Sequence, residues 1–137
     1  MILVDSSVWI AYYRPEGSED LKNIVKEAIS LDLVAVNGII IVEVLSGISK
    51  EAEVKKVGSD FKGFHYLSLS VEDFFEASSL GSSFRKKGLT VPATDLIIAT
   101  SAISARTTLY HLDSHFDQIA KYASLKVKNL TGQAGLA

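Results

Sequence analysis

The sequence predicts an α/β domain with a central, mostly parallel sheet and helices on both faces. Short runs of β-branched residues alternate along the chain with longer segments of helical periodicity. Parallel strands need a crossover connection, which is usually a helix, so this alternation favours a parallel sheet. A chain of 137 residues, 47% of them hydrophobic, is long enough for one packed core and short for two. We therefore expect a single domain over residues 1–137.

The first half of the chain predicts strands at 2–4 and 33–36, where apolar and β-branched residues run together. Each expected helix follows a residue that can cap it. The caps are Ser6 or Ser7 before a helix from Val8 to about Arg14, Ser18 before a helix with apolar residues through Ile29, and Asn37 before a helix that carries Glu43.

The second half continues the alternation, and no internal repeat or linker interrupts it. Strands are expected at 65–67, 109–112 and 125–128, the last of them at an edge of the sheet. Helices are expected over Glu51–Lys62, from Ser70 to the basic residues before Gly88, from the turn at Pro92 onward, and over Ser114–Tyr122.

Composition limits the class of protein and the kind of metal site. The chain has no cysteine, so any metal must be held by oxygen or imidazole, which favours Mg²⁺ or Mn²⁺. Its uncharged stretches fall short of the ~20 apolar residues of a membrane span, and its first residues lack the basic region of a signal peptide. We expect a cytoplasmic protein without a membrane segment. A net charge of −2 permits a local basic patch but argues against nonspecific adhesion to nucleic acid.

Four carboxylates, Asp5, Glu43, Asp95 and Asp113, lie beside apolar runs, where acids with a purely structural role are least expected. Glu43 and Asp95 are each the single charge in a long uncharged stretch. Burial of an unpaired carboxylate costs several kcal/mol, so such acids are normally paired or bound to a cation. Asp5 and Asp113 follow predicted strands, and the carboxyl ends of parallel strands meet at one edge of a sheet. The sequence therefore predicts that the four acids converge on a metal site.

Four motifs carry a resemblance to a known family. They are Asp5-Ser6-Ser7 after the first strand, Glu43-Val-Leu-Ser-Gly47, Asp95-Leu-Ile-Ile-Ala99 and Asp113-Ser-His-Phe116. In order and spacing they resemble the PIN-domain family, and within it the short toxin nucleases of the VapC type. Many relatives carry an acid directly before the final Phe, where this chain has His115. Asp113 is therefore the leading candidate for the fourth acid, and Asp117 is the alternative.

The resemblance implies a PIN-like fold and a Mg²⁺- or Mn²⁺-dependent endoribonuclease, in which metal-activated water attacks an RNA phosphodiester. It assigns Asp5, Glu43 and Asp95 as catalytic metal ligands, with Asp113 completing the site. Ser6 and Asn37 are the expected donors that hold carboxylates in place. The resemblance also implies a cognate antitoxin of the VapB type and a homodimer, for which Ile48, Phe74 and Phe75 are candidate contacts.

Other readings stay open. Asp5 and Asp113, taken singly, suit a turn and a helix N-cap. The three histidines form no ligand motif and are expected at the surface or hydrogen-bonded in the core. Arg14 and the basic run Arg85–Lys87 suit either solvated helix ends or RNA phosphates. No Walker-type loop is present, and Ser7 occupies the place of the second acid of an aspartyl phosphotransferase. The remaining rival is a PIN-like module that binds RNA or protein without cleaving it.

Overall fold

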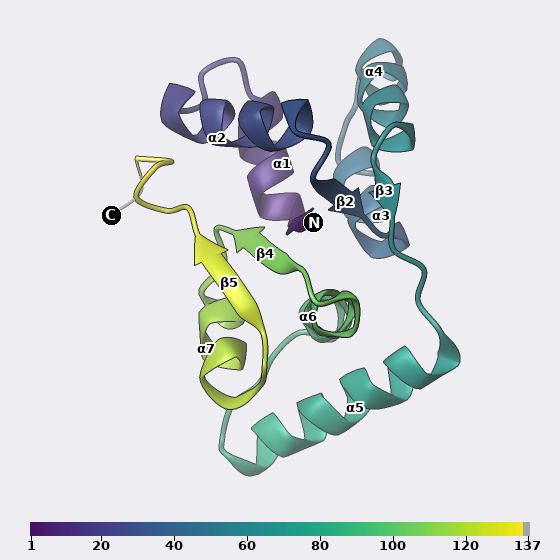
Figure 1. Ribbon diagram of the computed structural model, residues 1–137, viewed down its shortest axis with the longest axis vertical. Helices are drawn as coiled ribbons and strands as arrows, with labels where there is room; N and C mark the ends of the chain where they lie inside the picture. The colour runs from purple at the N-terminus through teal and green to yellow at the C-terminus, as the bar shows by residue number, and fades with distance from the viewer. Residues whose placement is uncertain (136–137) are drawn as a thin grey trace.

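The computed structural model describes residues 1–135 and contains five strands and seven helices within them (Figure 1). The strands are β1 (Ile2–Val4), β2 (Val34–Val36), β3 (His65–Tyr66), β4 (Thr108–His111) and β5 (Lys126–Asn129). The helices are α1 (Ser6–Tyr13), α2 (Glu19–Ser30), α3 (Gly38–Leu45), α4 (Glu51–Lys62), α5 (Val71–Lys86), α6 (Ala93–Ala105) and α7 (Ser114–Tyr122).

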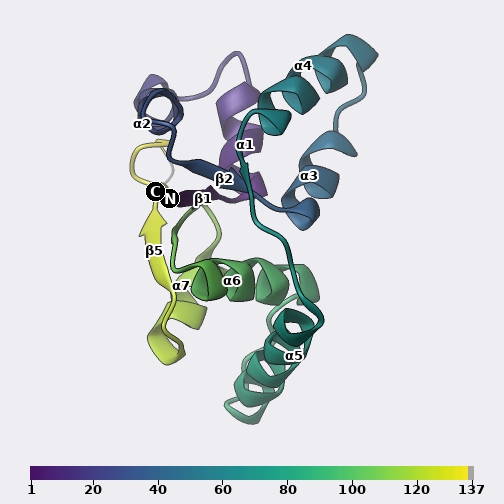
Figure 2. The ribbon, with the colours of Figure 1, turned by 45° about the vertical axis from the view of Figure 1, so that its right-hand side comes forward.

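The strands form one sheet in the order β3-β2-β1-β4-β5, and every pairing in it is parallel. Leu3 in the central strand pairs with Ala35 on one side and Leu109 on the other. Helices α1, α2 and α4 lie on one side of the strands, and α5, α6 and α7 lie on the other (Figures 1 and 2). The predicted α/β architecture is confirmed, with a sheet that is parallel throughout.

The order of the strands creates a switch point between β1 and β4. From β1 the chain builds outward through β2 and β3, and it then crosses back to add β4 and β5 on the opposite side of β1. In sheets of this kind, the loops at the carboxyl ends of the two strands diverge and leave a crevice where ligands bind. The residues that follow β1 and β4 therefore lie on either side of this crevice.

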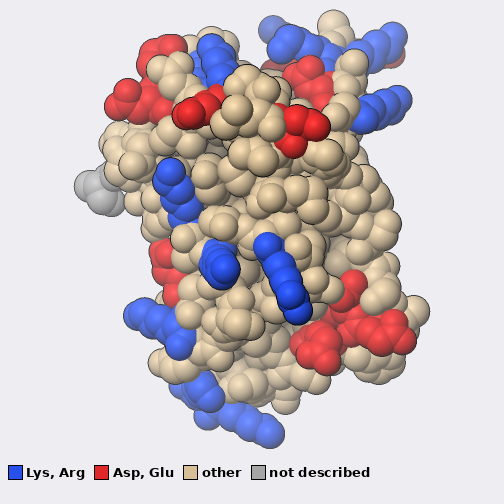
Figure 3. Space-filling view, in the orientation of Figure 1, with Lys and Arg blue, Asp and Glu red and all other residues tan. Residues whose placement is uncertain are grey.

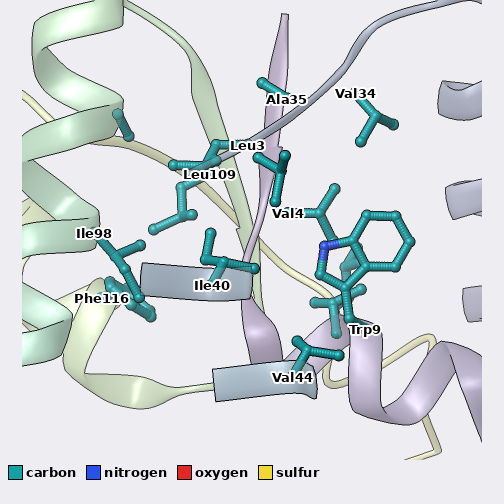
Figure 4. Close-up of a cluster of buried hydrophobic side chains, with 14 of the residues drawn as sticks. Leu3, Val4, Trp9, Val34, Ala35, Ile40, Val44, Ile98, Leu109 and Phe116 are labelled. Carbon is teal, nitrogen blue, oxygen red and sulfur yellow. The ribbon is translucent and has the colours of Figure 1, made fainter. Parts of the chain in front are cut away.

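The core consists of apolar side chains from the three inner strands and the helices packed on them (Figure 4). Trp9 in α1 is fully buried and stacks on Phe64, with ring centroids 5.3 Å apart. Leu3, Leu109 and Ile98 are fully buried in the same cluster. The inner strands are short, with every residue buried in β2 and buried or half-buried residues in β1 and β4, so this packing fixes them in place.

Several element boundaries differ from the predictions by one or two residues, among them the start of β2 at Val34 and the extent of β4 over Thr108–His111. The N-cap of α1 is Asp5 itself, whose side chain accepts the N–H of Ser7, and the helix begins at Ser6. The expected Ser6 or Ser7 cap is therefore wrong, because the chain turns from strand to helix through a single residue. β3 ends at Tyr66, and the last strand is displaced to Lys126–Asn129, where it pairs with the whole of β4.

Helix α5 packs along α6, and Gly81 of α5 lies against Leu96 of α6. A Cβ atom added there would lie 2.7 Å from Cδ1 of Leu96, so the absence of a side chain lets the helices approach. Leu96 is the neighbour of Asp95, so this contact supports the N-terminal turn of α6. No helix within residues 1–135 is long and apolar enough to cross a bilayer.

Asn37 is a buried polar link between two helices. Its Oδ1 accepts the N–H of Ile40 at 3.0 Å, which caps α3, and its Nδ2 donates to Ser101 Oγ of α6 at 3.2 Å. The residue is fully buried, so both hydrogen bonds form away from solvent. Loss of the side chain would remove the cap and leave the Ser101 hydroxyl without this partner.

We expect Asn37→Ala to lower the free energy of unfolding by about 2–4 kcal/mol, the sum of a lost cap and a lost buried hydrogen bond. Ser70→Ala, which removes the exposed cap of α5, is the matched control and should cost about 1 kcal/mol. Urea unfolding of the two variants measures both. Equal losses would show that the link to α6 contributes nothing.

Candidate active site

The four predicted acids converge at the carboxyl edge of the sheet. Asp5 directly follows β1, Asp113 lies just beyond β4, and Asp95 is in the first turn of α6. Glu43 extends from α3, and its Oε1 accepts a hydrogen bond from Ser6 Oγ, next to Asp5, at 3.1 Å. The four carboxylates interact electrostatically, since repulsion from Asp113 raises the pKa values of the other three. Side chains that are far apart in sequence thus share one pocket.

Asp5 is the most deeply placed of the four acids, with 3% of its surface exposed. Its Oδ2 accepts two hydrogen bonds from Ser7, from the hydroxyl at 2.5 Å and from the backbone N–H at 3.1 Å. Ser7 Oγ also accepts the N–H of Leu112 at 3.1 Å, which ties the start of α1 to the end of β4. Burial raises the pKa of Asp5, and the hydrogen bonds from Ser7 oppose that rise.

Asp95, Asp113 and His115 form the tightest group in the pocket. One ligand atom from each lies within 4.8 Å of the others, and His115 Nδ1 is 3.1 Å from both Asp95 Oδ2 and Asp113 Oδ1. Burial raises the pKa of Asp95 to about 6, and repulsion by Asp113 and Asp5 adds to the rise. The nearby imidazole of His115 acts in the opposite direction. Ionisation of Asp95 is therefore less favourable in the folded protein than in water.

His115 is the contact that the sequence reasoning missed. The sequence predicts a surface or hydrogen-bonded position for it, which the structure agrees with, but does not predict that its partners are two of the four acids. A signal was present in the sequence, because this residue occupies the place before Phe116 where many relatives carry an acid. The position before Phe116 is therefore beside the site in this chain too, although it carries an imidazole in place of a carboxylate.

Ser6 and Asn37 act on Glu43 in different ways. Ser6 donates its hydroxyl hydrogen to Glu43, as expected of a residue that orients a carboxylate. Burial raises the pKa of Glu43, the Ser6 hydrogen bond lowers it, and repulsion from Asp5 and Asp113 raises it further. The side chain of Asn37 bonds to Ile40 and Ser101, so it positions α3, which carries Glu43, and its hydrogen bonds do not reach a carboxylate.

Asp117 lies apart from the group formed by Asp95, Asp113 and His115. Its Oδ2 accepts a hydrogen bond from Asn129 Nδ2 at 2.8 Å, and its Oδ1 is 3.2 Å from Nε2 of the buried His111. Its neighbours are thus the β5 edge and the ring of His111. Of the two candidates for the fourth acid, Asp113 is the one that the fold brings to the other three.

Three helix N-termini face this pocket. Asp5 caps α1, Asp113 caps α7 and Asp95 is in the first turn of α6. The N-terminal end of a helix carries a partial positive charge from its unpaired N–H groups, which favours nearby anions. The reading of Asp113 as an N-cap is therefore correct, and Asp5, expected in a turn, is a cap as well. Both cap roles coexist with convergence on the pocket.

The donor set fits a hard divalent cation. It offers carboxylate oxygens from four side chains, the ligands that Mg²⁺ and Mn²⁺ prefer. Within residues 1–135, His115 is the only basic side chain in ion-pair contact with these acids, and no lysine or arginine reaches them. Asp113 and His115 are about one-third exposed, so the pocket opens to solvent on their side. A cluster that is repulsive, partly open and without a fixed cation suits a bound metal.

Comparisons with known proteins agree with this architecture. Residues 2–122 match the model of the PIN domain family. The chain is 29% identical to Ribonuclease VapC11 of Mycobacterium tuberculosis over 131 residues, which cover 92% of this chain and 96% of that protein. It is 28% identical to Ribonuclease VapC1 of Methanocaldococcus jannaschii over 122 residues, covering 88% and 82% of the two chains.

Solved structures share the fold at lower sequence identity. VapBC2 from Rickettsia felis, bound to a DNA fragment from its promoter, superposes with a TM-score of 0.75 at 19% identity, covering 94% of this chain and 98% of the other. FitAcB from Neisseria gonorrhoeae gives a TM-score of 0.71 at 20% identity, covering 94% and 97%. With the family model matched over most of its length and the acids gathered at the switch point of the sheet, the chain belongs to the PIN domain family.

Proposed function

We propose that this protein is a Mg²⁺- or Mn²⁺-dependent endoribonuclease and the toxin of a type II toxin–antitoxin pair, acting in the cytoplasm. The observation that carries the proposal is the pocket of four carboxylates, none of which forms an ion pair with a lysine or arginine within residues 1–135. Sequence similarity to proteins named VapC ribonucleases over nearly the whole chain supports it.

In this proposal Asp5, Asp95 and Asp113 hold the cation, with Glu43 as a further ligand, directly or through water. A bound divalent cation lowers the pKa of water and stabilises charge that develops on the phosphoryl group. Ser7 fixes the Asp5 carboxylate and Ser6 fixes that of Glu43, so two of the ligands are oriented before any cation binds. His115 contacts both Asp95 and Asp113 and lowers the pKa of Asp95.

Cations near the pocket are needed if an anionic RNA is to approach it. Arg85 lines a depression of about 400 Å³ together with Ser78, Ser82 and Leu96, the neighbour of Asp95. Figure 3 shows basic side chains over the C-terminal end of α5 at the lower left and acidic ones over its N-terminal end at the lower right. We assign the Arg85 end of α5 to contacts with RNA phosphates, which set position and not sequence preference.

We further propose a VapB-type antitoxin and a homodimer as partners. A largely apolar groove of about 290 Å³, lined by Trp9, Ile10, Val44 and Ile48 and also by the charged Arg14 and Glu53, suits a segment of the antitoxin. Phe74 and Phe75 on α5 are 45% and 71% exposed, which is unusual for side chains of that size. They suit the contact between two copies of the chain, whereas Ile48 belongs to the groove.

The rival function, a PIN-like module that binds RNA or protein without cleavage, does not need a charged pocket. Four carboxylates at mutual repulsion lower the stability of the fold, and a pure binding module would gain by losing them. Retention of all four acids therefore favours the enzyme.

We expect Asp5→Asn and Asp95→Asn to lower divalent-dependent RNA cleavage by at least about a hundredfold, because a metal ligand matters more than the groups that orient it. Asparagine is as good an N-cap as aspartate, so Asp5→Asn should keep its helix. Asp32→Asn, the same change at the opposite edge of the sheet, is the matched control. RNA cleavage by a purified folded variant at the rate of the Asp32→Asn protein would contradict the proposal.

The raised pKa of Asp95, about 6, predicts opposite effects of pH with and without metal. Its folded-state pKa lies above the ordinary value of 3.8, so the metal-free protein gains stability as pH falls from about 7 towards 4. The rise in melting temperature caused by Mn²⁺ should shrink over the same range, because protons compete for the ligand. Thermal unfolding at about pH 7.5 and about pH 5, with and without Mn²⁺, measures both. The same Mn²⁺ effect at both pH values would argue against ligation by Asp95.

The dimer proposal predicts that Phe74→Glu combined with Phe75→Glu converts the protein to a monomer, because two charges per subunit would have to be desolvated at the contact. Size-exclusion chromatography with light scattering measures the mass. Tyr122→Glu, an exposed aromatic of α7, is the control. An unchanged mass for both variants would place the contact elsewhere.

A further inference from the structure

We propose that His111 is a positioning residue for the metal site, which holds Asp113 in place by accepting its backbone N–H. In this arrangement Asp117 acts through His111 and is not itself a metal ligand. The inference rests on the proposed function, because it assigns a partner to one of the acids of that site. The inference adds His111 and Asp117, which are not among the four acids of the pocket.

The ring of His111 is fully buried at the end of β4 and packs against Phe116, with ring centroids 5.4 Å apart. Its Nδ1 accepts the backbone N–H of Asp113 at 3.1 Å. A nitrogen that accepts a hydrogen bond carries no proton, so the remaining ring proton is on Nε2. The Nε2–H tautomer is thus the one that this contact requires.

Asp117 favours the same tautomer from the other side of the ring. Its Oδ1 lies 3.2 Å from His111 Nε2, a close electrostatic contact outside regular hydrogen-bond geometry. Its Oδ2 accepts from Asn129 Nδ2 at 2.8 Å, and Asn129 is paired with His111 in the β4–β5 register. A carboxylate accepts and does not donate, so it disfavours the tautomer with a bare Nε2. In that other tautomer Nδ1 carries the proton and would face the N–H of Asp113, so two donors would meet and no hydrogen bond could form.

The hydrogen bond to His111 restrains the backbone of Asp113, whose position matters for the site. The Asp113 side chain accepts the N–H of His115 and also lies 3.1 Å from its imidazole, so its backbone position decides where the carboxylate meets Asp95 and Asp5. Residues that orient a metal ligand in this manner typically contribute 10–100-fold to metal affinity. Loss of the Nδ1 acceptor should therefore weaken metal binding without removing a ligand.

Three substitutions separate positioning from simple packing. His111→Asn places an amide oxygen near the position of Nδ1 and keeps an acceptor for the Asp113 N–H. His111→Gln reaches towards the position of Nε2 and loses that acceptor. His111→Phe keeps the shape of the ring against Phe116 and has no acceptor at all. A positioning role ranks Asn above Gln and Phe, whereas a packing role ranks Phe first.

Calorimetric titration with Mn²⁺ is the main measurement. We expect His111→Asn to bind within about fivefold of the unmodified protein, and His111→Gln and His111→Phe to bind about 10–100-fold more weakly. Amide hydrogen exchange of Asp113 by NMR, in the absence of metal, should be slow in the unmodified protein and in His111→Asn and faster in the other two. His65→Gln is the matched control, because His65 forms a similar pair with Asp32 at the far edge of the sheet.

An affinity for Mn²⁺ that is unchanged in His111→Phe would overturn the proposal, as would a loss in His111→Asn equal to that in His111→Gln. If the buried substitutions fail to fold, the ¹⁵N shifts of His111 in the unmodified protein decide the matter at neutral pH. The Nε2–H tautomer supports the proposal, and a protonated Nδ1 refutes it. Failure of the unmodified protein to bind Mn²⁺ would instead refute the proposed function, while the exchange measurements would still test the His111 contact.

Discussion

The repulsion between four carboxylates brought into one pocket is the constraint on which the rest of this structure depends. Burial raises the pKa values of Asp5, Glu43 and Asp95, and repulsion from Asp113 raises all three further. The fold compensates in part, by directing the N-terminal ends of α1, α6 and α7 at the pocket and by placing His115 between two acids. Because these groups offset only part of the repulsion between the carboxylates, the pocket has affinity for a divalent cation.

The sheet supplies the rigidity that such a site needs. β1 and β4 are neighbours on either side of the switch point, and the hydroxyl of Ser7 joins the turn after one strand to the end of the other. Asn37 links α3 to α6, and Gly81 lets α5 support the first turn of α6. Each acid is thus attached to an element that is anchored at another point, so the spacing of the carboxylates does not relax under their repulsion.

Local sequence signals were sufficient for most of the fold and for the choice of acids. Periodicity and capping residues predicted every strand and helix with small boundary shifts, and isolated charges in apolar runs identified Glu43 and Asp95. The roles of His111 and His115 were not predictable in this way. Their partners come from other elements or depend on ring orientation, as in the contact of His115 with Asp95 on α6. The cap of α1 was misplaced because Asp5 serves the helix and the pocket at once.

The double use of Asp5 and Asp113 as caps and as site acids has a genetic consequence. A single nucleotide change converts an aspartate codon to one for asparagine, which caps a helix equally well. Asp5→Asn or Asp113→Asn would therefore remove one acid of the pocket and keep the helix cap that the residue provides. A single base change thus separates the protein with its full set of site acids from an equally well-capped protein that lacks one of them.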